Sequence, residues 1–319
     1  MEIGSFIELQ FPKGKEYYAG EKDIARLNSG RAAILHAFRC TGAKTLWLPV
    51  YQCDCVREFL QKNGCALRFY RIDERFDPVD LTPSPEDAVL LVNYYGVMSH
   101  FRMASLAARY PHPVIDNSQA FFAPPVDGAY NVYSARKFVG APDGAYVLGP
   151  GAERFCGTYE QSFSSDTSVY LLERIEYGCE GKAYEARRRN ETRIDGEGLR
   201  RMSKLTRTIL DGAEYETIKA RRRENFDTAH RRFCGVNRLD PLRYYAEDCV
   251  PMVYPLLVED DGLLERFLAN KHFQGHWWSY LLEEVPEDSF EYYVSRYVIP
   301  VTIDQRYGQN ELEFIRSIV

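Results

Sequence analysis

Short apolar runs alternate with helix-length segments through the first half of the chain, and this alternation constrains the fold more than any other feature. The apolar runs end in turn residues and lie at 45–50, 66–72, 88–96 and 112–119. Helix-length segments lie between them at 55–64 and 101–110. Strands that alternate with helices form parallel sheets with crossover helices. The sequence therefore predicts an α/β fold in which the first domain carries a mostly parallel, doubly wound sheet flanked by helices.

A helix is predicted to start directly after Asn28, Ser29 and Gly30, because apolar residues recur from there with helical spacing until Gly42. The first backbone N–H groups of a helix lack partners, and the helix dipole favours negative charge there. This position could therefore bind an anion such as a phosphate. Serine and glycine before a helix are also ordinary capping residues.

The pattern changes after residue 112, where two extended segments at 128–137 and 144–149 are separated by a short loop. Residues 161–198 are polar and turn-rich, and we expect either a poorly ordered loop or an exposed helix. A long helical pattern runs from Leu199 to about Phe233, followed by mixed strands and helices. We predict an N-terminal arm (1–20), a large domain (21–198) and a connecting helix with a smaller C-terminal α/β domain (199–319).

Composition narrows the class of protein. A chain of 319 residues with 45% hydrophobic content can bury a large core. Its net charge of −6 argues against a nucleic-acid binder, and the arginine runs 187–189 and 221–223 are expected on solvated helix faces. It has no long uninterrupted apolar stretch and its opening lacks the order of a signal peptide, so we expect a cytoplasmic protein without membrane contact. Its eight cysteines lack framework spacing, which predicts reduced thiols.

Ligands of open α/β sheets bind where strands end, so polar residues after the apolar runs are the candidates. Asp116 follows a predicted strand, with Gln119 three residues later. Ser134 and Lys137 lie between two strand-like segments. Taken alone, the aspartate is more often a helix cap and the lysine more often a surface residue.

One cofactor needs all of these groups together. Pyridoxal phosphate (PLP) requires an anion site for its phosphate, a carboxylate against its ring nitrogen and a lysine amine for imine formation. The chain offers a helix-start glycine, then a strand-end aspartate, then a Ser-x-x-Lys loop.

In this order the chain resembles the DegT/DnrJ/EryC1/StrS family of PLP-dependent aminotransferases, which have fold type I. The resemblance extends more thinly from 201–210 to 298–308, so it covers nearly the whole chain. It is carried by LNSGRAAI at 27–34, WLPVYQCDCV at 47–56, VLLVNYYG at 89–96, VIDNSQAF at 114–121 and YSARKFVGAPDGAYV at 133–147.

The resemblance implies roles for three of these residues in the chemistry. Lys137 would be the Schiff-base lysine and would carry the proton between the substrate α-carbon and C4′ of the cofactor. Asp116 would keep the ring nitrogen protonated. Gln119 would lie near the 3-hydroxyl and the ring face.

The resemblance also implies how the cofactor phosphate is held and how the chain assembles. The backbone of Gly30 and Arg31 and the hydroxyl of Ser134 would bind the phosphate. Active sites of this fold type lie at a two-fold interface, so a homodimer is expected.

The sequence departs from the family pattern at several places. Cys53 stands where many members place an aromatic side chain over the cofactor ring, with Tyr51 nearby. The partner-chain asparagine that often reaches the phosphate is not evident near Leu199, and Asn190 is a possible substitute. The chain is also short for the family, mainly in the C-terminal half that usually completes the substrate pocket.

Two further features have simpler interpretations. Two thiols one residue apart, at Cys53 and Cys55, fail zinc-site spacing, so no metal is predicted. Aromatic residues at 276–282 and 290–300 are expected to pack the smaller domain, and Trp277 and Arg306 are candidates for substrate contact.

Four functions follow as alternatives. The first is an aminotransferase that moves an amino group from an amino acid to a small-molecule keto acceptor, such as a keto-sugar linked to a nucleotide. The second is a PLP enzyme of another type, although the family's dehydratases replace the lysine that Lys137 matches. The third is a PLP-binding regulator without turnover. The fourth is a nucleotide-binding module without PLP, which lacks support because no complete glycine-rich fingerprint is present.

Overall fold

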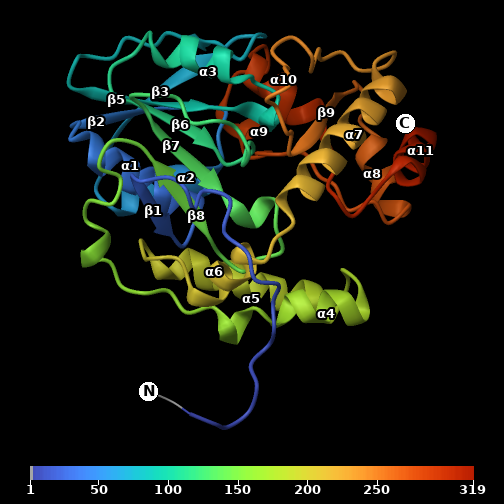
Figure 1. Cartoon of the computed structure of the whole chain (residues 1–319). Helices are drawn as coiled ribbons and strands as arrows, with labels where there is room; N and C mark the ends of the chain where they lie inside the picture. Colours follow the sequence, from blue (N-terminus) through green and yellow to red (C-terminus); the bar gives the residue numbers. More distant parts are fainter. Residues whose placement is uncertain (1–2) are drawn as a thin grey trace.

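Eight strands form one sheet in the order β1-β8-β7-β6-β5-β2-β3-β4 in this computed structural model, which describes residues 3–319 (Figure 1). The strands are β1 (Ile24–Leu27), β2 (Thr45–Pro49), β3 (Ala66–Ile72), β4 (Pro78–Val79), β5 (Asp87–Val92), β6 (Pro113–Asn117), β7 (Tyr130–Ser134) and β8 (Ala145–Leu148).

The central strands of this sheet are parallel. β3, β2, β5, β6 and β7 pair in parallel, whereas β8 runs antiparallel to both β7 and β1, and β4 is antiparallel to β3. The apolar runs are therefore strands in the structure. The prediction of a mostly parallel sheet is confirmed. The short strands β1 and β4 were not predicted.

Helices cover both faces of the sheet because the buried strands alternate their side chains. In β5, Leu90 packs in the core with helices α1 (Gly30–Thr41) and α2 (Asp54–Lys62). Its neighbour Leu91 packs in the opposite core, with α3 (His100–Ala107) and the C-terminal part of the chain. This alternation is the period-2 pattern of a strand buried on both sides.

The C-terminal part carries its own two-stranded antiparallel sheet of β9 (Val253–Leu257) and β10 (Val298–Thr302). Around it lie α8 (Leu263–Ala269), α9 (Leu281–Glu284), α10 (Phe290–Tyr297) and α11 (Gln309–Ile318). One hydrophobic cluster joins residues of this sheet to residues of β5 and β6. The predicted boundary between residues 198 and 199 stays a prediction.

The segment between the two sheets is more regular than the sequence suggested. Residues 161–198, expected to be poorly ordered or an exposed helix, contain two helices, α4 (Val169–Tyr177) and α5 (Lys182–Glu197). Helix α5 packs against the rest of the chain through a few buried residues, among them Ala186, Asn190 and Ile194. The single long helix expected from Leu199 is divided into α6 (Lys204–Asp211) and α7 (Tyr215–Phe233), separated at Gly212.

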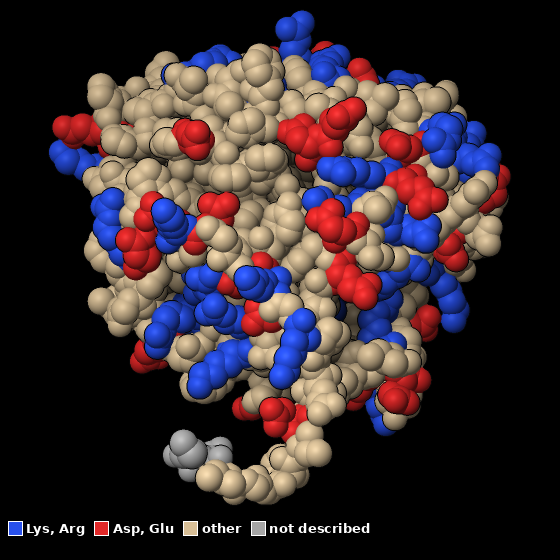
Figure 2. Space-filling view, viewed as in Figure 1, with Lys and Arg blue, Asp and Glu red and all other residues tan. Residues whose placement is uncertain are grey.

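The two arginine runs have different environments. Residues 187–189 lie exposed on α5, as expected. In the second run, however, Arg222 is buried on α7, so the expectation of a fully solvated run is wrong there. Figure 2 shows Lys and Arg interspersed with Asp and Glu over the face it draws.

The start of the chain projects from the body past α4 and α5 (Figure 1). Ile3, Phe6, Ile7 and Leu9 are largely exposed, whereas Glu16 is buried and accepts a hydrogen bond from the Tyr146 hydroxyl (3.0 Å). Across residues 3–319, no helix combines the length and the apolar character that crossing a bilayer requires.

Candidate active site

The parallel strands β2, β6 and β7 end at one edge of the sheet, and the candidate residues lie there. Gln52 and Cys53 follow β2, Asp116 lies in β6, and Lys137 follows β7. β6 and β7 are direct neighbours, and only β5 separates β6 from β2. The carboxyl edge of such a sheet is where α/β proteins bind ligands.

Asp116 is buried and its carboxylate is held by two donors. Gln52 Nε2 donates to its Oδ2 (3.0 Å), and the backbone N–H of Ser118 donates to its Oδ1 (2.9 Å). Each carboxylate oxygen can accept a further hydrogen bond. Asp116 is therefore fixed in direction while it keeps capacity for a donor on a ligand.

A small cradle forms where α1 begins. Ser29 caps this helix by accepting from the backbone N–H of Ala32 (3.3 Å). A Cβ atom on Gly30 would lie 3.2 Å from Ser118 Oγ and 3.8 Å from Ser134 Cβ, so both serines face the missing side chain. Two hydroxyls and a helix N-terminus converge on one point, an arrangement that suits an anion.

The cradle contains one residue that the sequence did not predict, whereas Arg31 was expected there only through its backbone. Ser118 was not predicted, because its place in the site depends on β6 and α1 meeting in space and not on any local pattern. The side chain of Arg31 points away to an ion pair with Asp195 and lies over the Phe59 ring at 5.6 Å, so only its backbone is available to the cradle.

The loop that carries Lys137 is fixed through its backbone. Ala135 N–H donates to Gly144 O (3.1 Å), and Gly144 N–H donates to Asn28 O (3.0 Å), which ties the loop to the chain entering α1. On the other side, Phe138 O accepts from Gln305 Nε2 (2.8 Å). The Lys137 side chain itself is exposed, so the backbone is held while the amine is free to move.

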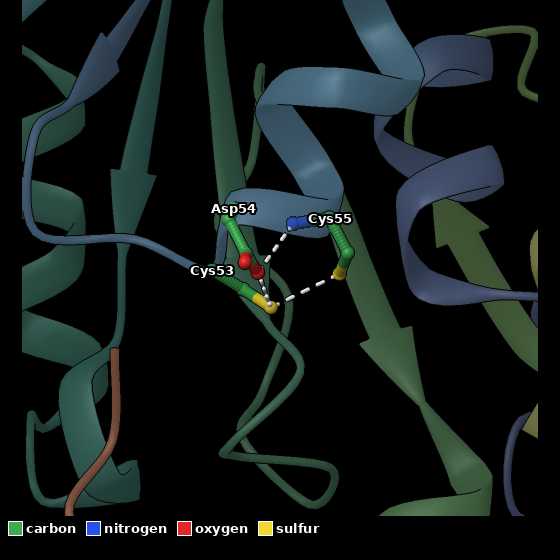
Figure 3. A group of neighbouring side chains, drawn as sticks. All are labelled: Cys53, Asp54 and Cys55. Atoms are coloured by element: carbon green, nitrogen blue, oxygen red, sulfur yellow. Dashed lines mark hydrogen bonds between the residues drawn. The ribbon is translucent and has the colours of Figure 1, made fainter. Parts of the chain in front are cut away.

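The Cys53 side of the site is a connected network, of which Figure 3 shows Cys53, Asp54 and Cys55. The Cys53 N–H donates to Gln52 Oε1 (2.9 Å), and Gln52 in turn donates to Asp116. The sulfurs of Cys53 and Cys55 are 3.0 Å apart. This contact, together with the positive charges of Arg31 and Lys137, lowers the pKa of the Cys55 thiol against the opposing effect of burial. The charge of Lys137 therefore acts on the Cys55 thiol.

A cavity of about 340 Å³ opens beside this network. Gln52, Cys53, Arg57 and Tyr280 are among its lining residues. Tyr280 donates its hydroxyl to Gln52 O (2.6 Å), so the C-terminal part of the chain closes one wall. Tyr51 is buried behind it, with Trp278 against its edge at 4.4 Å.

Gln119 is held by a strained turn. Its Oε1 accepts from the backbone N–H of Tyr95 (2.5 Å), which fixes the orientation of the amide and leaves its nitrogen as a donor for a ligand. Tyr95 has a φ of 61°, unusual for a bulky residue, and its ring stacks on Trp277 at 5.6 Å. Gly96 is required next to it, because a Cβ atom there would lie 2.2 Å from Gln119 O. Tyr95 thus contacts Gln119 through its backbone and Trp277 through its ring.

Residues of the C-terminal part contact Phe138, the neighbour of Lys137. Most of them were not predicted from the sequence. Arg222 lies over the Phe138 ring at 4.4 Å and donates to Met252 O (2.9 Å). Burial lowers the pKa of its guanidinium to about 10. Arg306 pairs with Asp304 (2.7 Å), directly after the Gln305 that holds Phe138.

Helix α5 closes another side of the Lys137 loop. Arg136 makes two hydrogen bonds to Glu191 (2.6 and 2.7 Å). Asn190 is buried, and its Nδ2 donates to Pro142 O (2.7 Å) while its Oδ1 accepts from Thr167. Its amide is therefore engaged within its own chain and supports the loop that follows Lys137.

Comparison with solved structures identifies the fold. The sugar aminotransferase CalS13 from Micromonospora echinospora matches with a TM-score of 0.63 at 16% identity, covering 94% of this chain and 87% of that chain. A DegT DnrJ EryC1 StrS aminotransferase from Brucella abortus matches with a TM-score of 0.60 at 12% identity, covering 94% and 86%.

A third solved structure carries a different activity on the same fold. It is the E. coli GDP-4-keto-6-deoxy-D-mannose-3-dehydratase with bound hydrated PLP, with a TM-score of 0.63 at 14% identity, covering 94% of this chain and 88% of that chain. No protein-family model and no curated protein matches the sequence. The chain therefore has the fold of these enzymes, and the predicted fold type I architecture is confirmed.

Proposed function

We propose that this chain is a PLP-dependent aminotransferase of the DegT/DnrJ/EryC1/StrS family, which transfers an amino group from an amino acid to a keto-sugar. The observation that supports the proposal is that Asp116, the loop of Lys137 and the Gly30 cradle lie at the same edge of the sheet. The sugar aminotransferases that share the fold support the substrate class.

The cradle fits the phosphate of PLP. Gly30 leaves open the space that a Cβ atom would fill, and the hydroxyls of Ser118 and Ser134 border that space. The first N–H groups of α1, at Gly30 and Arg31, add donors and the positive end of the helix dipole. A dianionic phosphate there would need no lysine or arginine side chain.

Asp116 would hold the cofactor ring. When bound, PLP supplies an electron-withdrawing ring that makes the α-proton of an amino acid acidic. The buried carboxylate, already oriented by Gln52 and Ser118, would balance the positive charge of the ring nitrogen. Gln119 would offer its amide N–H to the 3-hydroxyl, since Tyr95 occupies its oxygen. Cys53 would lie toward the ring face in place of an aromatic side chain.

Lys137 would hold and move the proton. Its backbone is anchored on both sides, whereas its side chain is free to reach different atoms. A mobile amine on a fixed loop is suited to take a proton from one carbon and return it to another. The retained lysine also argues against the dehydratase reaction, because that branch of the family replaces it.

Substrate binding would involve the C-terminal part. The Trp277 ring stacks on Tyr95, and Arg306 follows the Gln305 that contacts the Lys137 loop. The Arg306 side chain is about half exposed, which leaves its guanidinium available to an anionic group. We propose these two residues as contacts of the acceptor.

A homodimer would cover apolar side chains that the single chain leaves in water. Many of them are on the arm and around α4: Ile3, Phe6, Ile7, Leu9, Phe163, Leu172, Ile175, Tyr177 and Tyr184. Apolar groups exposed together mark interaction surfaces. We also propose a cytoplasmic location, since all eight cysteines are free thiols and a reducing compartment keeps them so.

The absorption spectrum of the purified protein with added PLP tests this function. We expect a visible band that is present in the wild type and in Lys62→Ala, a matched exposed lysine on α2, and absent in Lys137→Ala. Titration with glutamate should bleach the band. A band that ignores every amino donor would favour a PLP-binding regulator or another PLP reaction, and no Lys137-dependent band would refute PLP binding.

A further inference from the structure

Cys53 and Cys55 form a close thiol pair at the start of α2. Cys53 precedes the helix and Cys55 lies in its first turn, and Figure 3 shows the two sulfurs turned toward each other. The sulfurs are 3.0 Å apart, and a disulfide requires about 2.05 Å. The sulfurs would therefore have to approach by about 1 Å to reach bonding distance.

The two thiols have opposite acid strengths. Their mutual hydrogen bond lowers the pKa of Cys55 and raises that of Cys53, and the charges of Arg31 and Lys137 lower the pKa of Cys55 further. The N-terminal end of α2 adds a favourable dipole. Cys55 is thus the more acidic thiol of the pair.

The pair is also partly accessible, unlike the two buried cysteines of the chain. Cys53 lines the cavity of about 340 Å³ beside Gln52. By contrast, Cys40 and Cys249 are buried, and burial raises their pKa to about 11 and about 12. A small oxidant could therefore reach Cys53 through this cavity, with the more acidic Cys55 thiol 3.0 Å from its sulfur.

We propose that Cys53 and Cys55 are a redox-active dithiol that hydrogen peroxide converts to an intrachain disulfide at the wall of the Lys137 site. The Cys55 thiolate attacks one peroxide oxygen and breaks the O–O bond, and the departing hydroxide takes a proton to become water. The Cys53 sulfur then attacks the Cys55 sulfur and displaces the second oxygen, which leaves as water with the Cys53 proton. Two thiols lose two electrons in total, and peroxide is reduced to two waters.

A metal ion is the competing occupant of this cluster. The donor atoms of Cys53, Asp54 and Cys55 all lie within 4.8 Å of one another. However, Asp54 Oδ1 already accepts from the Cys55 N–H (2.7 Å), and the nearby charges of Arg31 and Lys137 oppose a cation. These features favour thiol oxidation over metal binding.

Peptide mapping tests the proposal without any cofactor or activity. Trypsin should release residues 45–57, which contain both cysteines, and residues 63–68, which contain Cys65 as an internal control. After brief peroxide treatment and alkylation, we expect the first peptide to carry no alkyl group and to have lost two hydrogens. The Cys65 peptide should stay alkylated, and dithiothreitol should restore double alkylation of 45–57.

Two variants locate the chemistry. In Cys53→Ser, we expect Cys55 to retain a sulfenic acid that dimedone traps, and in Cys55→Ser the peptide should keep its Cys53 alkylated. The proposal would be overturned if, under peroxide, the peptide 45–57 stayed doubly alkylated for as long as the Cys65 peptide stayed alkylated. Protection that a chelator reverses, and a reductant does not, would also overturn it and indicate a metal. Because these readouts need no PLP, their outcome is independent of the proposed function.

Discussion

The two sides of the candidate site are built in different ways. The sheet-edge side consists of Gly30, Asp116 and Lys137, each at the end of a strand or the start of a helix and held mainly through backbone contacts. The C-terminal side presents Arg222 and Gln305, which reach the Lys137 loop through side chains from distant parts of the sequence. The comparison suggests that cofactor chemistry depends on the first side, and that closure and stability depend on the second.

Asp116→Asn should have the largest effect on activity. The amide keeps the size of the side chain but cannot balance a positively charged ring nitrogen, so we expect kcat to fall by about 100-fold or more. Steady-state kinetics would measure this fall in kcat, and Asp127→Asn, at an exposed aspartate, serves as the control. Wild-type kcat in Asp116→Asn would remove the carboxylate from the proposed chemistry.

Gly30→Ala tests the cradle. The new methyl group would lie 3.2 Å from Ser118 Oγ, so we expect PLP affinity to fall by about tenfold, the equivalent of about 1.4 kcal/mol. Combining it with Ser118→Ala relieves the contact and should restore part of the affinity. Titration of PLP followed by absorbance measures both, and equal affinity in Gly30→Ala and wild type would place the phosphate elsewhere.

Arg222→Ala should act on stability and leave PLP binding within about twofold of wild type. It removes the donors to Pro251 O and Met252 O and the packing over Phe138, so we expect about 2–4 kcal/mol less unfolding free energy. Arg221→Ala, its exposed neighbour on α7, should change stability by less than about 0.5 kcal/mol. Urea unfolding distinguishes them. If Arg222→Ala lost the Lys137-dependent absorption band but kept wild-type stability, the C-terminal side would act on the cofactor and not on stability, contrary to the comparison.

The smallest effect concerns pH. Burial lowers the pKa of His272, after α8, to about 4, and the unfolded value is about 6.5. A lowered folded pKa means stability that is present above about 6.5 and lost as pH falls toward about 4. Thermal unfolding at several pH values should show this loss, and His272→Gln should reduce it. An unchanged pH profile in His272→Gln would assign the loss to other groups.

The sequence predicts the sheet-edge side well because its signals are local. Apolar runs closed by turn residues mark β2, β5 and β6, and Asp116 and Lys137 are found by their positions relative to those runs. Ser118 has no such signal, since its role exists only where β6 meets α1.

The C-terminal side shows why the rest escaped prediction. Arg222 stands in a run of three arginines, a pattern typical of a solvated face, and only the packing of α7 against Phe138 buries it. Residues 161–198 are rich in charge and turns, yet Asn190 and Ile194 give α5 a buried side that holds it as a helix. In both places, long-range packing overrides the local pattern.

The pairing of β1 with β8 affects how the chain is made. β1 lies at the edge of the sheet with β8 as its neighbour, and the register joins Ile24 to Leu148. A ribosome adds about 5–20 residues per second, so β1 waits roughly ten seconds before its neighbour is synthesised. Until then its backbone groups are unpaired and prone to wrong pairing. Productive folding of this protein is therefore expected to begin with β2, β3, β5 and β6, and the first strand in the sequence joins among the last.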